Sequence, residues 1–155
     1  MKICEWLEAR GIHCKDSRLI EQAFVHSSYV NEHKQLKHDN ERLEFMGDAV
    51  LQLWVSDKLF RLDPPLDEGR MTTFRAQLVC EEALAIYARQ LQLNSFLKLG
   101  VGEEKTGGRE RDSIIADMFE AMLGALYEDG GMAPIDNILT EVIMPHLSHP
   151  EEPII

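Results

Sequence analysis

The feature that most limits what this chain can fold into is a pair of apolar segments that carry acidic residues at helical spacing. The first, at 40–51, reads Asn-Glu-Arg-Leu-Glu-Phe-Met-Gly-Asp-Ala-Val-Leu, and the second, at 112–125, reads Asp-Ser-Ile-Ile-Ala-Asp-Met-Phe-Glu-Ala-Met-Leu-Gly-Ala. A helix turns by about 100° per residue, so Glu41, Glu44 and Asp48 fall within an arc of about 60°. The first segment therefore predicts a helix with one acidic face.

The second segment places Asp117 and Glu120 one turn apart on a single helix face. Apolar residues surround the acidic faces of both segments in nearly every direction, which is typical of buried helices. We therefore expect the first helix, over about 40–60, to be central and buried on all sides. Ala121 and Gly124 lie on or near the acidic face of the second helix, so another backbone can approach closely there.

Two acidic faces that meet in a protein interior need a positive partner. Carboxylates about 4 Å apart repel by roughly 4 kcal/mol per pair at an effective dielectric constant near 20. A domain has a net stability of only about 10 kcal/mol, so several such pairs would strain it. Protonation relieves part of the repulsion, and Mg²⁺ or Mn²⁺, which take hard oxygen ligands, relieve more. The pattern predicts a divalent metal site; the alternative is a set of solvated surface acids in an acidic chain.

Length and composition limit the possible functions. A chain of 155 residues is expected to form one domain. The formal net charge of −11 argues against a nucleic-acid partner, although bound cations would change the local sign of the charge. The three cysteines, Cys4, Cys14 and Cys80, form no Cys-x-x-Cys pair and indicate reduced thiols in the cytoplasm. We see no signal peptide and no apolar stretch long enough to span a membrane.

Helical apolar spacing recurs along almost the whole chain and no segment shows the alternation of a strand, so we predict an all-α fold, a helical bundle around the first acidic helix. The other helices are expected at about 3–9, 17–24, 71–79, 81–91 and 134–147. We expect a helix cap at Asp16 or Ser17, a break at Pro64-Pro65, a flexible loop at 99–108, a cap at Asp112 or Ser113 and a stop at 129–131. The domain would cover 1–147, with 148–155 as a linker or tail.

Together these motifs resemble a known family. Residues 40–51 resemble the signature motif of the ribonuclease III family, and 112–125 resemble its second catalytic segment. Weaker matches occur in the family's order at 24–29, 67–69, 75–79 and 99–108, so the resemblance covers about 15–147. The departures are Asp39, Met46 and Asp112, and none of them falls on a residue expected to bind metal.

The resemblance implies a mostly helical endonuclease domain that forms a homodimer and cuts double-stranded RNA. The cuts would be staggered and would leave 5′-phosphate and 3′-hydroxyl ends, in the processing of rRNA and mRNA or in RNA decay. Bacterial members usually continue into a double-stranded-RNA-binding domain, and this chain contains none. We therefore expect a catalytic fragment of a longer protein.

The resemblance also implies roles for single residues. The metal ligands, for Mg²⁺ or for Mn²⁺ in its place, map to Glu44, Asp48, Asp117 and Glu120. Asp48 and Glu120 are also expected to be catalytic, with Glu41 as the outer acid of the signature and Glu68 lining the cleft near the partner subunit's site. Phe45 corresponds to an aromatic residue that inserts into a pocket of the partner at the dimer interface.

Basic residues near the glycine-rich loop are candidates for RNA contacts. Lys105, Arg109 and Arg111 could bind phosphates, although solvated loop charges explain them equally well. The loop lacks the Gly-Lys-Ser/Thr ending of a nucleotide-binding loop, so no nucleotide cofactor is expected.

Two other functions remain open at this stage. His38 and Asp39, with His26 and His33 nearby in sequence, could belong to a metal-dependent HD-type phosphohydrolase, although His26 alone is better explained as a hydrogen-bonded structural residue. The domain could also bind RNA without cutting it. The intact acidic set argues against this second alternative, because a non-catalytic relative has no evident need for acids that repel one another.

Overall fold

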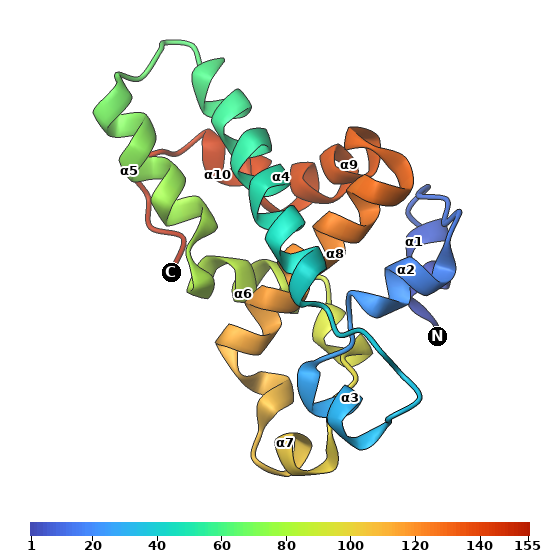
Figure 1. Ribbon diagram of the computed structural model, residues 1–155. Coiled ribbons are helices and arrows are strands. Elements are labelled where there is room, and N and C mark those ends of the chain that lie inside the picture. The colour runs from blue at the N-terminus through green and yellow to red at the C-terminus, as the bar shows by residue number, and fades with distance from the viewer.

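The computed structural model describes residues 1–155 and contains ten α-helices, two short 3-10 helices and no β-strand (Figure 1). This confirms the predicted all-α fold. The elements are α1 (Ile3–Glu8), α2 (Ser17–Gln22), α3 (Ser27–Glu32), α4 (Glu41–Phe60), α5 (Glu68–Val79), α6 (Glu81–Gln90), η1 (Leu93–Phe96), α7 (Val101–Lys105), η2 (Gly108–Glu110), α8 (Asp112–Gly130), α9 (Met132–Val142) and α10 (Met144–Leu147). No helix is both long enough and apolar enough to cross a membrane.

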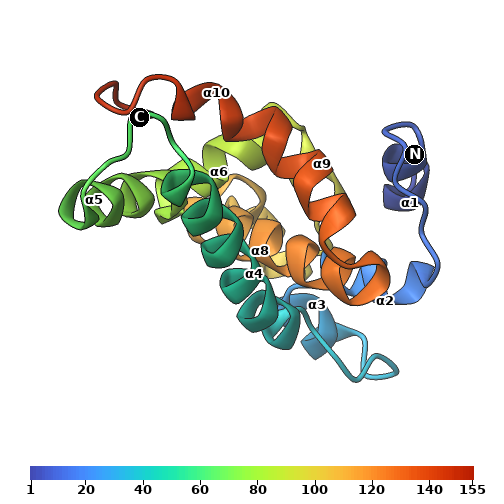
Figure 2. The ribbon, with the colours of Figure 1, turned by 90° about the horizontal axis from the view of Figure 1, so that it is seen from above.

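Helices α4 and α8 cross at the centre of the molecule, and the other helices pack around them (Figures 1 and 2). Helices α2, α6 and α9 contact α8, whereas α5 packs along α4. The buried side chains form one continuous apolar core, to which α8 contributes along most of its length. The two segments with acidic faces are therefore also the two helices on which the fold is built.

The two central helices approach each other closely at a pair of glycines. A Cβ atom on Gly47 of α4 would overlap the carbonyl oxygen of Glu120 on α8, and one on Gly124 would overlap the carbonyl oxygen of Leu43 on α4. Both overlaps are with backbone, which has no free rotamer to move away. The close backbone approach expected at Gly124 is confirmed, and the helix that makes it is α4.

Most of the predicted helix boundaries are confirmed. The carboxylate of Asp16 caps α2 by accepting from the backbone N–H of Leu19 at 3.3 Å. Gly131, with φ +71°, ends α8 in a conformation that favours glycine. The backbone of Cys80 is extended and separates α5 from α6, at the boundary between the helices expected over 71–79 and 81–91.

Three local predictions were wrong. The segment 99–108 is not a plain loop, since its centre forms α7. Neither Asp112 nor Ser113 caps α8, because Asp112 is already inside the helix and bonds to Arg89 at 2.7 Å. The last helical segment begins at Met132, before Pro134, and not at the proline.

The prediction that the first acidic helix is buried on all sides was also wrong for the single chain. Leu51 and Val55 are fully buried, but Phe45, Leu53 and Phe60 are 81%, 62% and 73% exposed. The reason is that α8 and α5 cover only part of the α4 surface. One side of α4 therefore presents large apolar side chains to solvent, an arrangement that typically marks an interaction surface.

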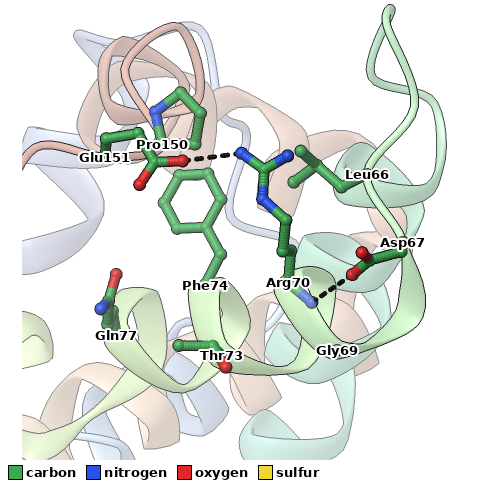
Figure 3. Close-up of a pocket in the computed structure, with 9 residues that line it drawn as sticks. All are labelled: Leu66, Asp67, Gly69, Arg70, Thr73, Phe74, Gln77, Pro150 and Glu151. Carbon is green, nitrogen blue, oxygen red and sulfur yellow. Dashed lines mark hydrogen bonds and ion pairs between the residues drawn. The ribbon is translucent and has the colours of Figure 1, made fainter.

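The residues after α10 fold back onto α5 (Figure 3). The carboxylate of Glu151 accepts from the guanidinium of Arg70 at 2.6 Å, and Pro150 lies over the ring of Phe74. Both partners in this ion pair are more than half exposed, so the pair contributes little to stability. The segment predicted to be a linker or tail thus lies along the body of the protein.

We predict that Gly47→Ala destabilises the protein by about 2–3 kcal/mol, because the new methyl group would force α4 and α8 apart. Thermal or urea denaturation at a fixed protein concentration measures the change. Gly102→Ala is the matched control, since a Cβ there meets nothing within 4 Å and alanine favours the helix. Equal stability of Gly47→Ala and the wild type would contradict the proposed close packing.

Candidate metal centre

The crossing of α4 and α8 brings acidic side chains from both helices into one cluster. Carboxylate oxygens of Glu44, Asp117 and Glu120 all lie within 4.8 Å of one another, and this is the one group of three or more potential metal ligands in the structure. Glu44 comes from α4 and the other two from α8, and Glu44 and Glu120 are partly shielded from solvent. The structure therefore brings together three of the four residues expected to bind metal.

The fourth expected ligand, Asp48, lies one turn after Glu44 on α4 and faces the same cluster. The nearby Asp48 carboxylate contributes to the raised pKa values of both Glu120 and Glu44. The side chain of Asp48 is exposed, so it forms the solvent side of the cluster. All four predicted ligands thus lie in one continuous acidic site.

The cluster carries negative charge that its surroundings do not balance. Burial, followed by the charge of Asp117, raises the pKa of Glu44 to about 7. Burial, followed by the hydrogen bond with Asp48, raises the pKa of Glu120 to about 9. Burial also raises the pKa of Asp117, although a hydrogen bond from Glu44 and the nearby His26 act in the opposite direction. In the absence of a cation, the cluster therefore holds protons near neutral pH.

The donor set fits a hard divalent cation. None of the chain's ion pairs involves Glu44, Asp48, Asp117 or Glu120. Partly buried carboxylate oxygens without a basic partner are the ligands that Mg²⁺ and Mn²⁺ prefer. A bound cation would take the place of the protons and remove the repulsion that raises these pKa values.

Glu41 lies at the edge of the cluster. It is the first residue of α4, one turn before Glu44, and its side chain is exposed. Its charge is one of the smaller contributions to the raised pKa of Glu44, after burial and Asp117. The structure therefore places Glu41 near the site without making it part of the three-carboxylate group.

Glu68 lies far from the acidic cluster of its own chain. It begins α5 and lines a hollow with Ser56, Phe60 and Arg75 near the other end of α4. Helical rise alone separates Glu44 from Ser56 by about 18 Å. Glu68 could therefore join an acidic site only if that site belonged to a second copy of the chain.

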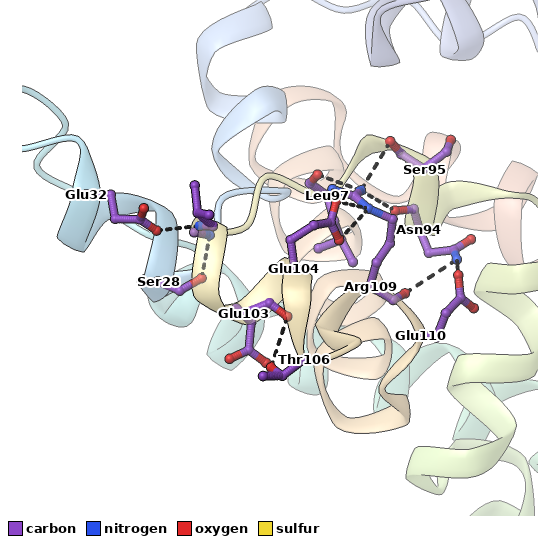
Figure 4. Close-up of polar contacts among 12 residues, drawn as sticks. Ser28, Glu32, Asn94, Ser95, Leu97, Glu103, Glu104, Thr106, Arg109 and Glu110 are labelled. Carbon is purple, nitrogen blue, oxygen red and sulfur yellow. Dashed lines mark hydrogen bonds and ion pairs between the residues drawn. The ribbon is translucent and has the colours of Figure 1, made fainter.

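Two of the three basic residues proposed for RNA contacts are used inside the protein, and Figure 4 shows the contacts of one of them, Arg109. The guanidinium of Arg109 pairs with Glu104 at 2.8 Å and donates to the carbonyl oxygen of Leu97 at 2.7 Å. Arg111 pairs with Glu103. Lys105 forms no ion pair, so it is the member of this set that is free to bind a phosphate.

The histidines do not form a metal site. Nδ1 of His26 accepts from the backbone N–H of Ser28 at 3.1 Å and caps α3, as expected of a structural histidine. The ring of His33 stacks on Tyr29 at 3.9 Å. No cluster of potential ligands contains a histidine, so the structure does not support the HD-type alternative.

Sequence reasoning did not recognise the role of Asn40. Its side chain is buried and donates to the carbonyl oxygen of Ala23 at 2.9 Å, which fixes the start of α4 against the end of α2. An amide residue just before a helix usually signals a cap, but Asn40 caps nothing. Its partner lies 17 residues earlier in the chain, and only the fold reveals it.

Comparison with known proteins identifies similar sequences. A family model described as Ribonuclease-III-like matches residues 16–147. Ribonuclease 3 of Bacillus cereus strain AH187 is 51% identical over 142 residues, and Ribonuclease 3 of Bacillus anthracis strain A0248 is 51% identical over the same length. The match covers 91% of this chain and 58% of the Bacillus cereus protein, so the chain spans a little over half the length of these relatives.

Solved structures show the same fold. The nuclease domain of ribonuclease III from Campylobacter jejuni matches with a TM-score of 0.81 at 36% identity, over 98% of this chain and 99% of that chain. A second structure of that domain, with a TM-score of 0.80 at 33% identity, covers 92% and 99% and concerns flexibility in a region involved in dimer formation. Dicer from Pichia stipitis matches with a TM-score of 0.63 at 29% identity, over 91% of this chain and 60% of that chain.

We predict that Glu120→Gln stabilises the metal-free protein at pH 8. The pKa of Glu120 is about 9 in the folded protein, whereas that of an unperturbed glutamate is 4.5. The folded state therefore holds a proton that the unfolded state loses, and stability falls as the pH rises between these two values. Gln cannot ionise, so the stability of the Glu120→Gln variant does not fall with pH through this group.

Water screens part of the repulsion, so we expect a gain of about 1–2 kcal/mol at pH 8, which raises the Tm by about 2–8 °C. The gain should shrink towards pH 5. Denaturation in chelator at both pH values measures it, with Glu82→Gln on the exposed face of α6 as the control. A variant no more stable than the wild type at pH 8 would contradict the repulsion in the cluster.

Proposed function

The chain belongs to the ribonuclease III family, and from that premise we propose that it is a metal-dependent endoribonuclease domain that hydrolyses double-stranded RNA. The observation that carries this proposal is the cluster of Glu44, Asp117 and Glu120 at the crossing of α4 and α8. The expected products have 5′-phosphate and 3′-hydroxyl ends. Processing of rRNA and mRNA, or RNA decay, in the cytoplasm is the cellular role that we propose.

We propose that Glu44, Asp48, Asp117 and Glu120 hold Mg²⁺, for which Mn²⁺ can substitute. A bound divalent cation lowers the pKa of a water molecule and stabilises negative charge on the leaving oxygen. The carboxylates hold the cation in place, and their raised pKa values mean that they release protons when it binds. Glu41, at the edge of the cluster, would help to hold the site or its water.

We propose that the protein forms a homodimer through the exposed side of α4. Phe45, Leu53 and Phe60 lie on this side, and a second copy would cover them in an isologous contact. A hollow of about 450 Å³ lies beside the start of α4, and its lining combines polar and charged residues with the apolar side chains of Leu19, Val30, Leu43 and Met46, against which an aromatic ring would pack. Phe45 would insert into such a pocket of the partner.

The dimer would also give Glu68 its role. Glu68 lines a hollow next to Phe60, on the side of the molecule that the second copy would cover. In that arrangement Glu68 lies in the cleft near the acidic cluster of the partner. Two equivalent clusters facing opposite RNA strands would give a staggered cut, and recognition would depend on the A-form shape of the duplex rather than on its sequence.

Cleavage of a defined RNA duplex tests the proposed activity. The protein is incubated at low salt with a fully paired, end-labelled duplex in magnesium, and in parallel with chelator or with a single-stranded RNA. We expect magnesium-dependent, staggered cutting of the duplex alone. Binding of the duplex without cutting in magnesium would instead favour an RNA-binding module.

We predict that Glu120→Gln lowers the rate of cleavage at least about a hundredfold, since the variant loses an anionic oxygen at the cluster. The fold and the dimer should remain intact by circular dichroism and sedimentation. Glu82→Gln removes the same charge from an exposed site on α6 and should cleave at the wild-type rate. Comparable cutting by both variants would reject the assignment of Glu120.

We predict that Phe45→Ala weakens dimerisation at least about tenfold, because a buried aromatic residue commonly dominates the energy of an interface. Analytical ultracentrifugation over a concentration series measures the dissociation constant. Val101→Ala, which shortens an apolar side chain that is 60% exposed on α7, should leave dimerisation unchanged. Equal association of the two variants would rule out the inserted-aromatic role.

A further inference from the structure

Helix α7 is held in place by residues from α3. It has only five residues, too few for a helix that is stable by itself in water. The carboxylate of Glu32 accepts from the backbone N–H of Val101 at 2.6 Å, and the hydroxyl of Ser28 accepts from that of Gly100 at 2.8 Å (Figure 4). The start of α7 thus takes its hydrogen-bond acceptors from two side chains about 70 residues earlier in the chain.

The segment before α7 is also joined to the start of α3. Lys98 donates its backbone N–H to the carbonyl oxygen of Phe24 at 2.8 Å, and its own carbonyl oxygen accepts from the backbone N–H of His26 at 3.1 Å. A Cβ atom on Gly100 would lie 2.7 Å from the carbonyl oxygen of Ser28, so the two segments are in close backbone contact. We expect α3 and α7 to move as one unit.

The unit formed by α3 and α7 links Lys105, a positive charge without an ion-pair partner, to the acidic cluster. The other charged residues of α7 are already paired, since Glu103 bonds to Arg111 and Glu104 to Arg109. Lys105, at the end of α7, has no ion-pair partner. At the other end of the unit, α3 is capped by His26, which lies near Asp117 of the cluster.

We propose that Glu32 is a positioning residue for RNA binding: its carboxylate fixes α7 so that Lys105 contacts a phosphate of the duplex whose scissile strand lies at the acidic cluster. The inference rests on the proposed function, because it assumes that this cluster acts on RNA. Ser28 helps to hold α7 in the same position, because its hydroxyl accepts from the backbone N–H of Gly100.

If Glu32 positions α7, removal of its carboxylate weakens RNA binding, which is the opposite of what its charge alone predicts. Glu32 is negative and exposed, so its removal should strengthen binding to a polyanion if charge alone matters. Glu32→Ala and Glu32→Gln remove the same charge, but only Gln retains an oxygen that can accept from Val101. The two variants therefore separate the hydrogen bond from the charge.

The test measures magnesium-dependent cleavage of an RNA duplex by the full chain. For Glu32→Ala we expect KM to rise about three- to tenfold while kcat stays within about twofold, because the contact is with bound substrate and not with the reacting atoms. Glu32→Gln should keep KM at or below the wild-type value. Hydrogen exchange of the Val101 amide should be faster in Glu32→Ala than in the wild type and unchanged in Glu32→Gln.

A double-mutant cycle tests whether Glu32 acts through Lys105. Lys105→Ala should raise KM on its own, and Glu32→Ala should have no further effect in that background. Glu82→Ala, which removes an exposed acid from α6, is the control and should not raise KM. Thermal denaturation of every variant separates a loss of stability from a loss of binding.

Two results would overturn the proposal, and a third would reject the function on which it rests. If Glu32→Ala and Glu32→Gln lower KM alike, charge alone explains the residue. If Glu32→Ala raises KM equally with and without Lys105, the residue does not act through that lysine. Failure of the wild-type protein to cut or bind the duplex would instead reject the proposed function, and this result is read from the wild type before any variant is compared.

Discussion

Two backbone contacts between α4 and α8 determine the arrangement of the rest of the structure. At Gly47 and Gly124 each helix lies directly against carbonyl oxygens of the other, at a spacing that leaves no room for a side chain. Gly47 lies between Glu44 and Asp48, and the carbonyl group that it contacts belongs to Glu120. The close packing of the two helices is therefore also what assembles the acidic cluster, so the core and the candidate site depend on the same residues.

That packing holds groups together that repel one another. Burial raises the pKa values of Glu44, Asp117 and Glu120, so the metal-free protein keeps protons that an exposed glutamate or aspartate would have released. The apolar contacts of α4 and α8 with the rest of the core offset this cost. A cation and these protons compete for the same oxygens, so cation binding, pH and folding stability are coupled at a single place in the fold.

The distribution of the other charges explains how a chain with a net charge of −11 can be proposed to bind RNA. Arg109 and Arg111 form ion pairs with Glu104 and Glu103, and these pairs hold the segment around α7 together. Lys105 is left without an acidic partner. Total charge is therefore a poor guide to the binding surface of this protein, because what matters is which cations lack an internal partner and where they lie relative to the acidic cluster.

By itself the sequence determined the all-α class, the two acidic faces, the helix cap at Asp16 and the helix end at Gly131, because each depends on the helical period or on one residue's local conformational preference. The resemblance of the motifs to a known family supplied the pairing of the two faces, which periodicity cannot provide. Only the tertiary structure decided that one side of α4 is exposed to solvent. The spacing of apolar residues in a sequence is the same whether the chain's own helices or a second chain cover them. It also decided that 101–105 is helical, because the acceptors that stabilise α7 come from Glu32 and Ser28, far away in the chain. Local patterns record the conformation that a segment prefers, whereas these features depend on contacts that exist only once distant segments have met.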